Sequence, residues 1–302
     1  MTAGDQSTAQ NLGKEQTQIS SLPAKIIASE NLTYALVYEG ISQKRHQHGE
    51  PLIVLIAGVP GSEQDYRYLS PLIYEWAPVV RVVLPGFGVL EDQDNAPASG
   101  LAKAQYLKQV ADAEQWASLL VVGHSMGGVA CIYWAGIDRR VKSLALLCSV
   151  GIQAHRGLAF GAWTARFLWL ITKLPIIGQY LLQRFRNAMM QMGFSKHKLD
   201  AVQLRLILQH VIYLDFKDNK KRLGHEYLAY LDQVGVFWCL DDPIVDINAS
   251  QALVRHLENS IPTEKLLKRC IEKGGHNPQK HQRLDVNHWL SALYNFYTQR
   301  KA

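Results

Sequence analysis

Ser125 lies in a pattern that suits a catalytic nucleophile. Residues 123–127 read Gly-x-Ser-x-Gly, between an apolar segment, Ala117–Val122, that is typical of a buried strand, and a helical pattern. On a tight strand-to-helix turn, a strained backbone exposes the serine hydroxyl, and Gly123 and Gly127 let the two elements approach because they lack Cβ atoms. The helix also directs its N-terminal N–H groups at developing negative charge. The pattern therefore predicts acyl chemistry at Ser125, against the alternative of a chance match to a short motif.

A serine hydroxyl is a weak nucleophile at neutral pH and needs a base, for which histidine is the usual residue. Of the 11 histidines, His276 is the best candidate, because it follows a predicted strand and lies on a flexible Gly-Gly loop. His124 lies inside the serine motif, where we expect a supporting role. We expect His46 and His48 to face solvent, and His288 to pack in the core on the apolar side of the last helix.

Short apolar segments alternate with helical patterns, and these elements must position the candidate residues. The predicted strands are 25–29, 32–38, 52–57, 79–84, 117–122, 141–149, 233–240 and 265–271. The predicted helices are 65–76, 101–115, 129–135, 249–258 and 282–297, with a polar connection at 43–50. This alternation implies an α/β fold with a mostly parallel central sheet and helices on both faces, whose active sites lie beyond the carboxyl ends of the strands. Gly58, Ser125, Asp242 and His276 all follow predicted strands, so we expect them at this edge.

The alternation stops at residues 152–230, which show only helical patterns. This segment holds 12 Lys and Arg against 4 Asp and Glu, a charge of +8 within a chain whose net charge is +6. Charged residues, glycine and proline interrupt its longest apolar run, Leu158–Leu182, which argues against a membrane span. We therefore divide the chain into a polar N-terminal tail (1–24), an α/β core (25–151 and 231–302) and an inserted helical cap or lid.

The order of these elements resembles the α/β-hydrolase fold over nearly the whole chain. Residues 57–62 resemble the family's His-Gly-x-Pro-Gly oxyanion loop, although alanine replaces the usual histidine. Residues 84–88 resemble its Pro-Gly-x-Gly turn, and residues 238–245 resemble the strand end that supplies the catalytic acid. The Gly-His at 275–276 resembles the segment that carries the base. The resemblance implies a serine hydrolase in which the helical insertion forms the cap.

The catalytic acid of this fold can follow either of two strands. No carboxylate follows the strand at 141–149, which leaves Asp241, Asp242 and Asp246 after the next strand. The match to the family's Asp-Pro-Ile-Val segment favours Asp242 over Asp241. Asp242 then lies between the predicted nucleophile and the predicted base in chain order, as the resemblance implies.

The resemblance also implies an oxyanion hole, because a tetrahedral intermediate needs two N–H donors. The donors would be the N–H groups of Met126, which follows the nucleophile, and of Val59 in the first loop. The residues that support the turn and the loop would be Gly58, Gly123, His124 and Gly127.

The sequence offers little support for other chemistry. No metal-ligand spacing, Gly-x-Gly-x-x-Gly pattern or P-loop occurs, so we predict no cofactor and no metal. The positive charge belongs to the aromatic-rich insertion, which argues against binding of nucleic acid. This charge fits a lid near an anionic or membrane-like surface, and the alternative is that the helix faces are simply solvated. The cysteines share no close spacing and predict reduced, structural thiols in a cytoplasmic protein. They are Cys131, Cys148, Cys239 and Cys270.

Apolar side chains of the insertion predict either an acyl pocket under a lid or simple packing between the cap helices. They are Phe160, Trp163, Phe167, Trp169, Leu181, Leu182, Met189, Met190, Met192 and Phe194. We predict an esterase or lipase-like hydrolase of a small-molecule acyl substrate. Two alternatives stay open: a carbon–carbon bond hydrolase of ring-cleavage products, whose carboxylates would suit a basic cap, and a non-catalytic relative that binds a ligand. A serine nucleophile argues against the relatives that attack through aspartate, the epoxide hydrolases and haloalkane dehalogenases.

Overall fold

The computed structural model describes residues 19–91, 96–154, 161–191 and 199–299. Its strands are β1 (Lys25–Ala28), β2 (Thr33–Tyr38), β3 (Leu52–Ile56), β4 (Val79–Val83), β5 (Leu119–His124), β6 (Val141–Leu147), β7 (Gln233–Cys239) and β8 (Leu266–Ile271). Its α-helices are α1 (Ser42–Gln47), α2 (Ser70–Tyr74), α3 (Gly100–Ala113), α4 (Met126–Ile137), α5 (Gly161–Ile171), α6 (Pro175–Gln191), α7 (Ala201–Ile212), α8 (Phe216–Arg222), α9 (His225–Leu228), α10 (Ile247–Glu258), α11 (Pro278–His281) and α12 (Arg283–Gln299). Short 3-10 helices are η1 (Glu63–Tyr66), η2 (Gly88–Leu90) and η5 (Thr263–Lys265).

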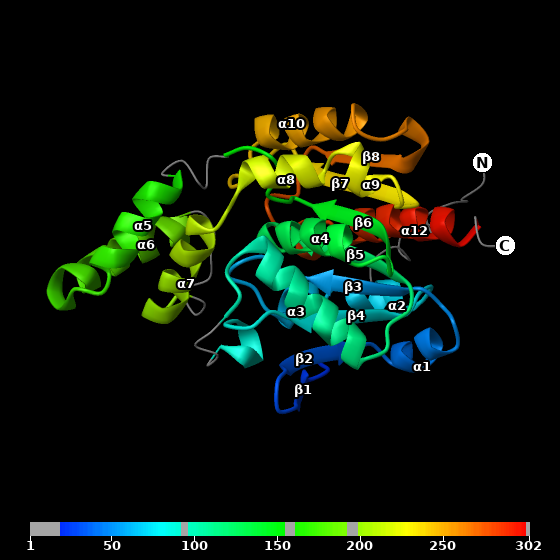
Figure 1. The fold of residues 1–302 in the computed structure, drawn as a ribbon, viewed down its shortest axis with the longest axis horizontal. Coiled ribbons are helices and arrows are strands. Elements are labelled where there is room, and N and C mark those ends of the chain that lie inside the picture. Colours follow the sequence, from blue (N-terminus) through cyan, green and yellow to red (C-terminus); the bar gives the residue numbers. More distant parts are fainter. Residues whose placement is uncertain (1–18, 92–95, 155–160, 192–198, 300–302) are drawn as a thin grey trace, which may run out of the picture.

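The described strands form one sheet in the order β1-β2-β4-β3-β5-β6-β7-β8 (Figure 1). The pairs β1–β2 and β2–β4 are antiparallel, and the pairs from β4–β3 to β7–β8 are parallel. Helices α3, α4 and α10 cover one face, and α2 and α12 cover the other. Strands β3 and β5 are therefore buried along their whole length, which explains their unbroken apolar sequences. The predicted fold class is confirmed.

The chain between β6 and β7 forms helices α5 to α9, which lie in two places. Helices α5, α6 and α7 pack together beside one end of the sheet, at the left of Figure 1. Helices α8 and α9 instead return to the core and pack against α4. There Asn219 donates a hydrogen bond of 3.0 Å to the carbonyl of Gly151, and the guanidinium of Arg222 lies 4.1 Å from the ring of Tyr133.

Helix α7 connects the outer helices to the sheet. The side-chain amide of Gln203 donates a hydrogen bond of 3.0 Å to the carbonyl of Gly86, and the ring of His210 packs edge-on against Phe87 at 5.3 Å. Both contacts fall on the loop that follows β4.

The predicted tail at 1–24 lies mostly outside the described residues, but Ser20 is buried and its hydroxyl accepts a hydrogen bond of 2.8 Å from Arg81.

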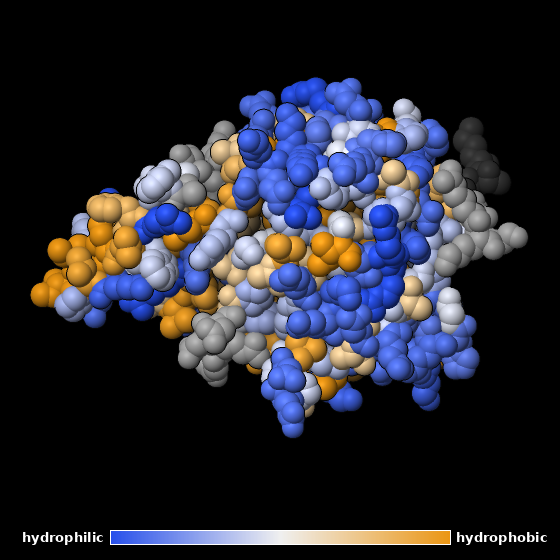
Figure 2. Space-filling view, in the orientation of Figure 1, coloured by the Kyte–Doolittle hydropathy of each residue, from blue (hydrophilic) through white to orange (hydrophobic). Residues whose placement is uncertain are grey.

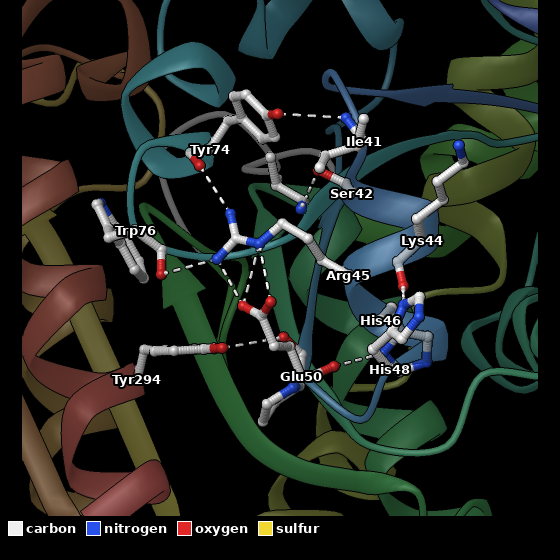
Figure 3. A network of polar contacts seen from close by, with 12 residues as sticks. Ile41, Ser42, Lys44, Arg45, His46, His48, Glu50, Tyr74, Trp76 and Tyr294 are labelled. Atoms are coloured by element: carbon white, nitrogen blue, oxygen red, sulfur yellow. Dashed lines mark hydrogen bonds and ion pairs between the residues drawn. The ribbon is translucent and has the colours of Figure 1, made fainter.

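The predicted polar connection after β2 contains helix α1 and a polar network (Figure 3). Arg45 donates hydrogen bonds to both carboxylate oxygens of Glu50 and to the carbonyl of Tyr74. His46 is buried, with Nδ1 2.7 Å from the Glu50 carbonyl and Nε2 accepting from the N–H of Ala117. The expectation that His46 faces solvent was wrong, because backbone groups satisfy both of its ring nitrogens. His48 is exposed, as predicted.

Two other expectations need correction. The helix predicted at 65–76 is divided into η1 and α2, because Pro71 begins a new helix at one of the first positions of α2. The last helix forms as predicted, but His288 is exposed rather than packed in the core. Helix α12 instead turns Val286, Leu290 and Leu293 toward the sheet, and these side chains are fully buried.

Candidate active site

Ser125 forms the turn between β5 and α4. Its φ of 53° and ψ of −125° place it in a backbone region that residues with a side chain rarely adopt. Such a conformation costs about 1–3 kcal/mol and persists only where the surroundings hold it. The Ser125 N–H donates to the carbonyl of Leu147 at 3.1 Å, and the N–H of Val150 donates to the Ser125 carbonyl at 3.1 Å. Two backbone hydrogen bonds, one to the last residue of β6 and one to the segment after it, therefore hold the strained turn.

Close backbone approaches explain the glycines of the turn. A Cβ atom on Gly123 would lie 2.6 Å from the backbone nitrogen of Gly128, across the turn itself. A Cβ atom on Gly127 would lie 2.6 Å from the carbonyl oxygen of Ile56, at the end of β3. Real Cβ contacts do not occur at such distances, so both positions require glycine.

His276 lies in the loop after β8 and joins the side chains of Ser125 and Asp242. Its Nε2 is 2.9 Å from Ser125 Oγ, and its Nδ1 is 2.9 Å from Asp242 Oδ2. Each of the three residues is only 7% exposed. The carboxylate can only accept, so Nδ1 carries the proton and Nε2 accepts from the serine hydroxyl. The structure thus brings the three predicted catalytic residues into one chain of hydrogen bonds.

Both carboxylate oxygens of Asp242 have partners. Oδ2 faces His276, while Oδ1 accepts hydrogen bonds from the N–H groups of Ile244 at 2.8 Å and Val245 at 3.0 Å. Burial raises the pKa of Asp242, but the hydrogen bond to His276 and the two backbone N–H groups outweigh burial and lower it overall. The carboxylate is therefore ionised at neutral pH and fixed in orientation.

The other two candidate acids have different partners. Asp241 is exposed, and its Oδ1 accepts hydrogen bonds from the N–H groups of Gly274 at 2.9 Å and Gly275 at 2.8 Å. Asp246 caps α10 by accepting from the first N–H groups of that helix. Among the three carboxylates, Asp242 is the one that reaches His276. Asp241 instead fixes the loop that carries the histidine, a contact for which the sequence holds no signal.

His124 contacts the loop that carries His276. Its Nε2 is 2.6 Å from the carbonyl oxygen of His276, and the two ring centroids are 4.8 Å apart. Burial, together with the neighbouring His276 ring, lowers the pKa of His124 to about 4. The neutral ring can therefore donate its Nε2 proton to the carbonyl.

The two predicted oxyanion donors belong to the residue after Ser125 and to the loop after β3. Met126 is the first residue of α4, where an N–H group has no carbonyl partner inside the helix. Val59 is buried in the loop after β3, next to Gly58, and the Val59–Pro60 peptide bond is cis. A Cβ atom on Gly58 would lie 2.8 Å from the Cβ of Ser125, so this loop runs directly beside the serine.

The sequence profile of the Alpha/beta hydrolase family matches residues 53–288. The chain belongs to this family. The match extends from β3 into α12 and so includes the whole hydrogen-bonded chain around Ser125. No curated protein matches the sequence.

Solved structures of other hydrolases share the fold. An alpha/beta hydrolase fold protein from Burkholderia ambifaria is 20% identical, with a TM-score of 0.66 over 89% of this chain and 97% of that chain. A bacterial membrane phospholipase A is 20% identical, with a TM-score of 0.59 over 91% and 87%. A haloalkane dehalogenase variant from Bradyrhizobium elkanii is 16% identical, with a TM-score of 0.65 over 94% and 100%. Because identities this low show the fold alone, they do not select among these reactions.

The candidate pocket residues of the hydrolase's insertion lie in different environments. Leu182 and Met189 are buried, whereas Trp163 is 83% exposed and Phe167 is 62% exposed. Phe160, Met192 and Phe194 lie outside the described residues. The exposed aromatic rings therefore neither line an enclosed pocket nor pack between helices.

Two further properties of the hydrolase concern its cysteines and its helices. Cys131, Cys148 and Cys239 are buried, and Cys270 is exposed; all four are free thiols. Within the described part of the chain, no helix has the length and apolar character needed to cross a membrane.

Proposed function

We propose that the protein is a serine hydrolase that cleaves a carboxylic ester or a related acyl substrate with an apolar acyl group. The observation that carries this proposal is the hydrogen-bonded chain Asp242–His276–Ser125, with the serine on a strained turn at the N-terminus of α4. A buried histidine that accepts from a serine hydroxyl while donating to a carboxylate is the arrangement that activates serine for attack on a carbonyl.

The proposed reaction has two steps. Ser125 Oγ attacks the carbonyl carbon while its proton moves to Nε2 of His276, and the anionic Asp242 stabilises the imidazolium. His276 then protonates the leaving alcohol, which leaves an acyl-enzyme. A water molecule, deprotonated by the same Nε2, releases the acid and restores the serine. The N–H groups of Met126 and Val59 would bind the oxyanion in both steps, and loss of one such donor costs about 3 kcal/mol of transition-state stabilisation.

The identity of the nucleophile favours acyl transfer over the other reactions of the fold. An alkoxide attacks carbonyl carbon and forms an ester that water can hydrolyse. Among the proteins of similar fold, the phospholipase is named for acyl-ester cleavage and the dehalogenase for a reaction at carbon–halogen bonds. We place this chain with the acyl hydrolases because Ser125, not a carboxylate, occupies the turn.

The first experiment is labelling with a fluorophosphonate, which phosphonylates activated serines. We expect the wild type to be labelled at Ser125, and Ser125→Ala and His276→Ala to remain unlabelled. The matched control is Ser143→Ala, because Ser143 is also buried but lies near the opposite end of β6. On p-nitrophenyl esters of increasing acyl length, we expect Ser125→Ala to lower kcat about 10⁴-fold or more.

Three results would each contradict the proposal. A folded wild type that resists labelling would exclude an activated serine and favour a ligand-binding relative. Labelling at Ser125 with turnover of a ring-cleavage diketo acid, but of no ester, would reassign the protein to carbon–carbon bond hydrolysis. An ester series in which the shortest acyl groups react fastest and long groups not at all would exclude the apolar acyl preference.

A further inference from the structure

Exposed apolar side chains gather on the outer side of helices α5 and α6, a surface that we call the hairpin face. Figure 2 shows these hydrophobic residues at the end of the molecule formed by α5 and α6. The main contributors are Trp163, Phe167, Leu170, Ile176, Ile177 and Tyr180, of which Trp163 and Ile176 are each 83% exposed. Single exposed apolar residues are ordinary, but a continuous group of this size marks a surface that meets another apolar phase.

The packing of α5 does not require these residues. Its inner side already buries Ala165 against Leu208 and Val211 of α7. Trp163, Phe167 and Leu170 follow a spacing of four and three residues, which places them along the opposite side of the helix. The helix therefore has two apolar sides, and packing within the protein uses one of them.

The charged side chains of the segment that forms the hairpin face, residues 152–199, have one sign. Residues 152–199 contain no Asp or Glu. The ammonium of Lys173 lies 3.7 Å from the ring of Trp169, and the guanidinium of Arg166 lies 5.6 Å from the ring of Trp163. The guanidinium of Arg184 lies 6.0 Å from the ring of Tyr180. Cations thus lie beside the apolar side chains, with no acidic residue of the same segment to neutralise them.

We propose that the hairpin face docks on an anionic lipid bilayer, with its apolar side chains in the interface and its cations against the lipid headgroups. Aromatic and aliphatic residues on one side of a helix, flanked by Lys and Arg, are the features that hold a helix in the plane of a membrane surface. No described helix is able to span the bilayer, so the hairpin lies on it. A second copy of the chain fits less well, because two such faces would bring like charges together.

Vesicle binding tests this proposal without depending on the proposed activity. The Ser125→Ala protein, which cannot turn lipid over, is sedimented with phosphatidylglycerol-containing vesicles and with pure phosphatidylcholine vesicles. We expect binding to the anionic vesicles that falls as salt screens the cations. Trp163→Ser with Ile176→Ser should weaken binding at least tenfold. Ile41→Ser is the matched control, because Ile41 is 56% exposed but lies beside α1, at the opposite end of the molecule.

Variants that remove charge provide a second test of vesicle binding. Arg166→Gln with Lys173→Gln should weaken binding to anionic vesicles and leave the thermal midpoint unchanged, because both side chains lie on the surface. The proposal is overturned if the parent protein does not sediment with anionic vesicles, or if the double Trp163/Ile176 variant binds as well as its parent. It is also overturned if sedimentation velocity shows a dimer that the double variant dissociates, since the occupant of the face would then be a second copy.

Discussion

Helix α4 and the hairpin of α5 and α6 are both rich in apolar residues, yet the structure uses them in opposite ways. Every residue of α4 from Met126 to Ala135 is buried, between β5 and β6 on one side and α3 and α8 on the other. The hairpin packs through one side only and exposes the other. Apolar side chains in α4 fix the position of Ser125, whereas those of the hairpin are available to a partner. Burial, rather than composition, separates a supporting element from a binding surface.

The two regions also differ in how their polar groups are satisfied. Around Ser125, Asp242 and Asp241 each accept two backbone hydrogen bonds, and His124 donates to the loop that carries His276. On the hairpin, Arg166, Lys173 and Arg184 lie near aromatic rings, and residues 152–199 contain no Asp or Glu. A fixed network suits catalysis, because it needs no reorganisation during the reaction. A surface rich in cations suits attraction to an anionic partner.

The largest expected effect separates the two neighbouring aspartates. Asp242→Asn should lower kcat about 10⁴-fold, because an amide in place of the carboxylate favours the wrong tautomer of His276. Asp241→Asn keeps an oxygen that can accept from Gly274 and Gly275, so we expect a loss below about tenfold. Ester kinetics on both variants checks this, with labelling by the fluorophosphonate as a second readout. Equal losses would show that Asp241 and Asp242 act as one unit.

The next effect concerns the close packing of α4. In Gly127→Ala the new methyl group would meet the backbone carbonyl of Ile56, and we expect a loss of at least about 2 kcal/mol in the free energy of unfolding. Gly136→Ala is the matched change on the same helix, where the Cβ would meet side-chain atoms of Arg222 at 3.3 Å and Tyr227 at 3.8 Å and no backbone atom within 4 Å. It should be neutral or stabilise by up to about 1 kcal/mol. Urea unfolding of both variants measures the difference, and a Gly127→Ala protein of normal stability would show that the turn can relax.

The sequence predicts the core well because its signals are local. Unbroken apolar runs predict buried parallel strands, and the glycine spacing around Ser125 predicts a turn that needs close approach. The catalytic acid is harder to predict, because Asp241 and Asp242 are adjacent and chemically alike. Only the path of the loop at 274–276 shows which carboxylate faces the histidine. A resemblance to the family favoured Asp242, but no periodicity did.

Burial is where the sequence misleads. His46 lies in a polar segment, yet Ala117, distant in sequence, supplies the N–H that makes its burial favourable. His288 lies close to the apolar stripe of the last helix, yet that helix turns Val286 and Leu290 toward the sheet instead. Trp163 lies in an apolar stretch of sequence that is typical of buried residues, yet its side chain is exposed. These outcomes depend on which elements meet in space, and a single sequence does not encode them locally.

Acid should destabilise the core through His124. The pKa of this histidine is about 4 in the folded protein and about 6.5 when unfolded, so the unfolded state binds more protons between these values. The contribution of the neutral His124 ring to stability is complete above pH 6.5 and is lost as the pH falls toward 4. The loss amounts to about 2 kcal/mol at pH 5. His124→Asn removes this contribution. We expect the stability difference between wild type and variant to shrink by that amount between pH 7.5 and pH 5, and a constant difference would contradict the burial of a neutral ring.

The smallest expected effect is the loss of the hairpin's exposed side chains in the absence of lipid. Trp163→Ser with Ile176→Ser should change the free energy of unfolding by no more than about 0.5 kcal/mol, because both side chains are in water before and after unfolding. The kcat on a soluble short-chain ester should also stay within about twofold of wild type. Urea unfolding and ester kinetics in plain buffer check both values. A loss of several kcal/mol would mean that the hairpin face is covered within the protein, which would remove the contrast with α4 and the basis for a bilayer as its partner.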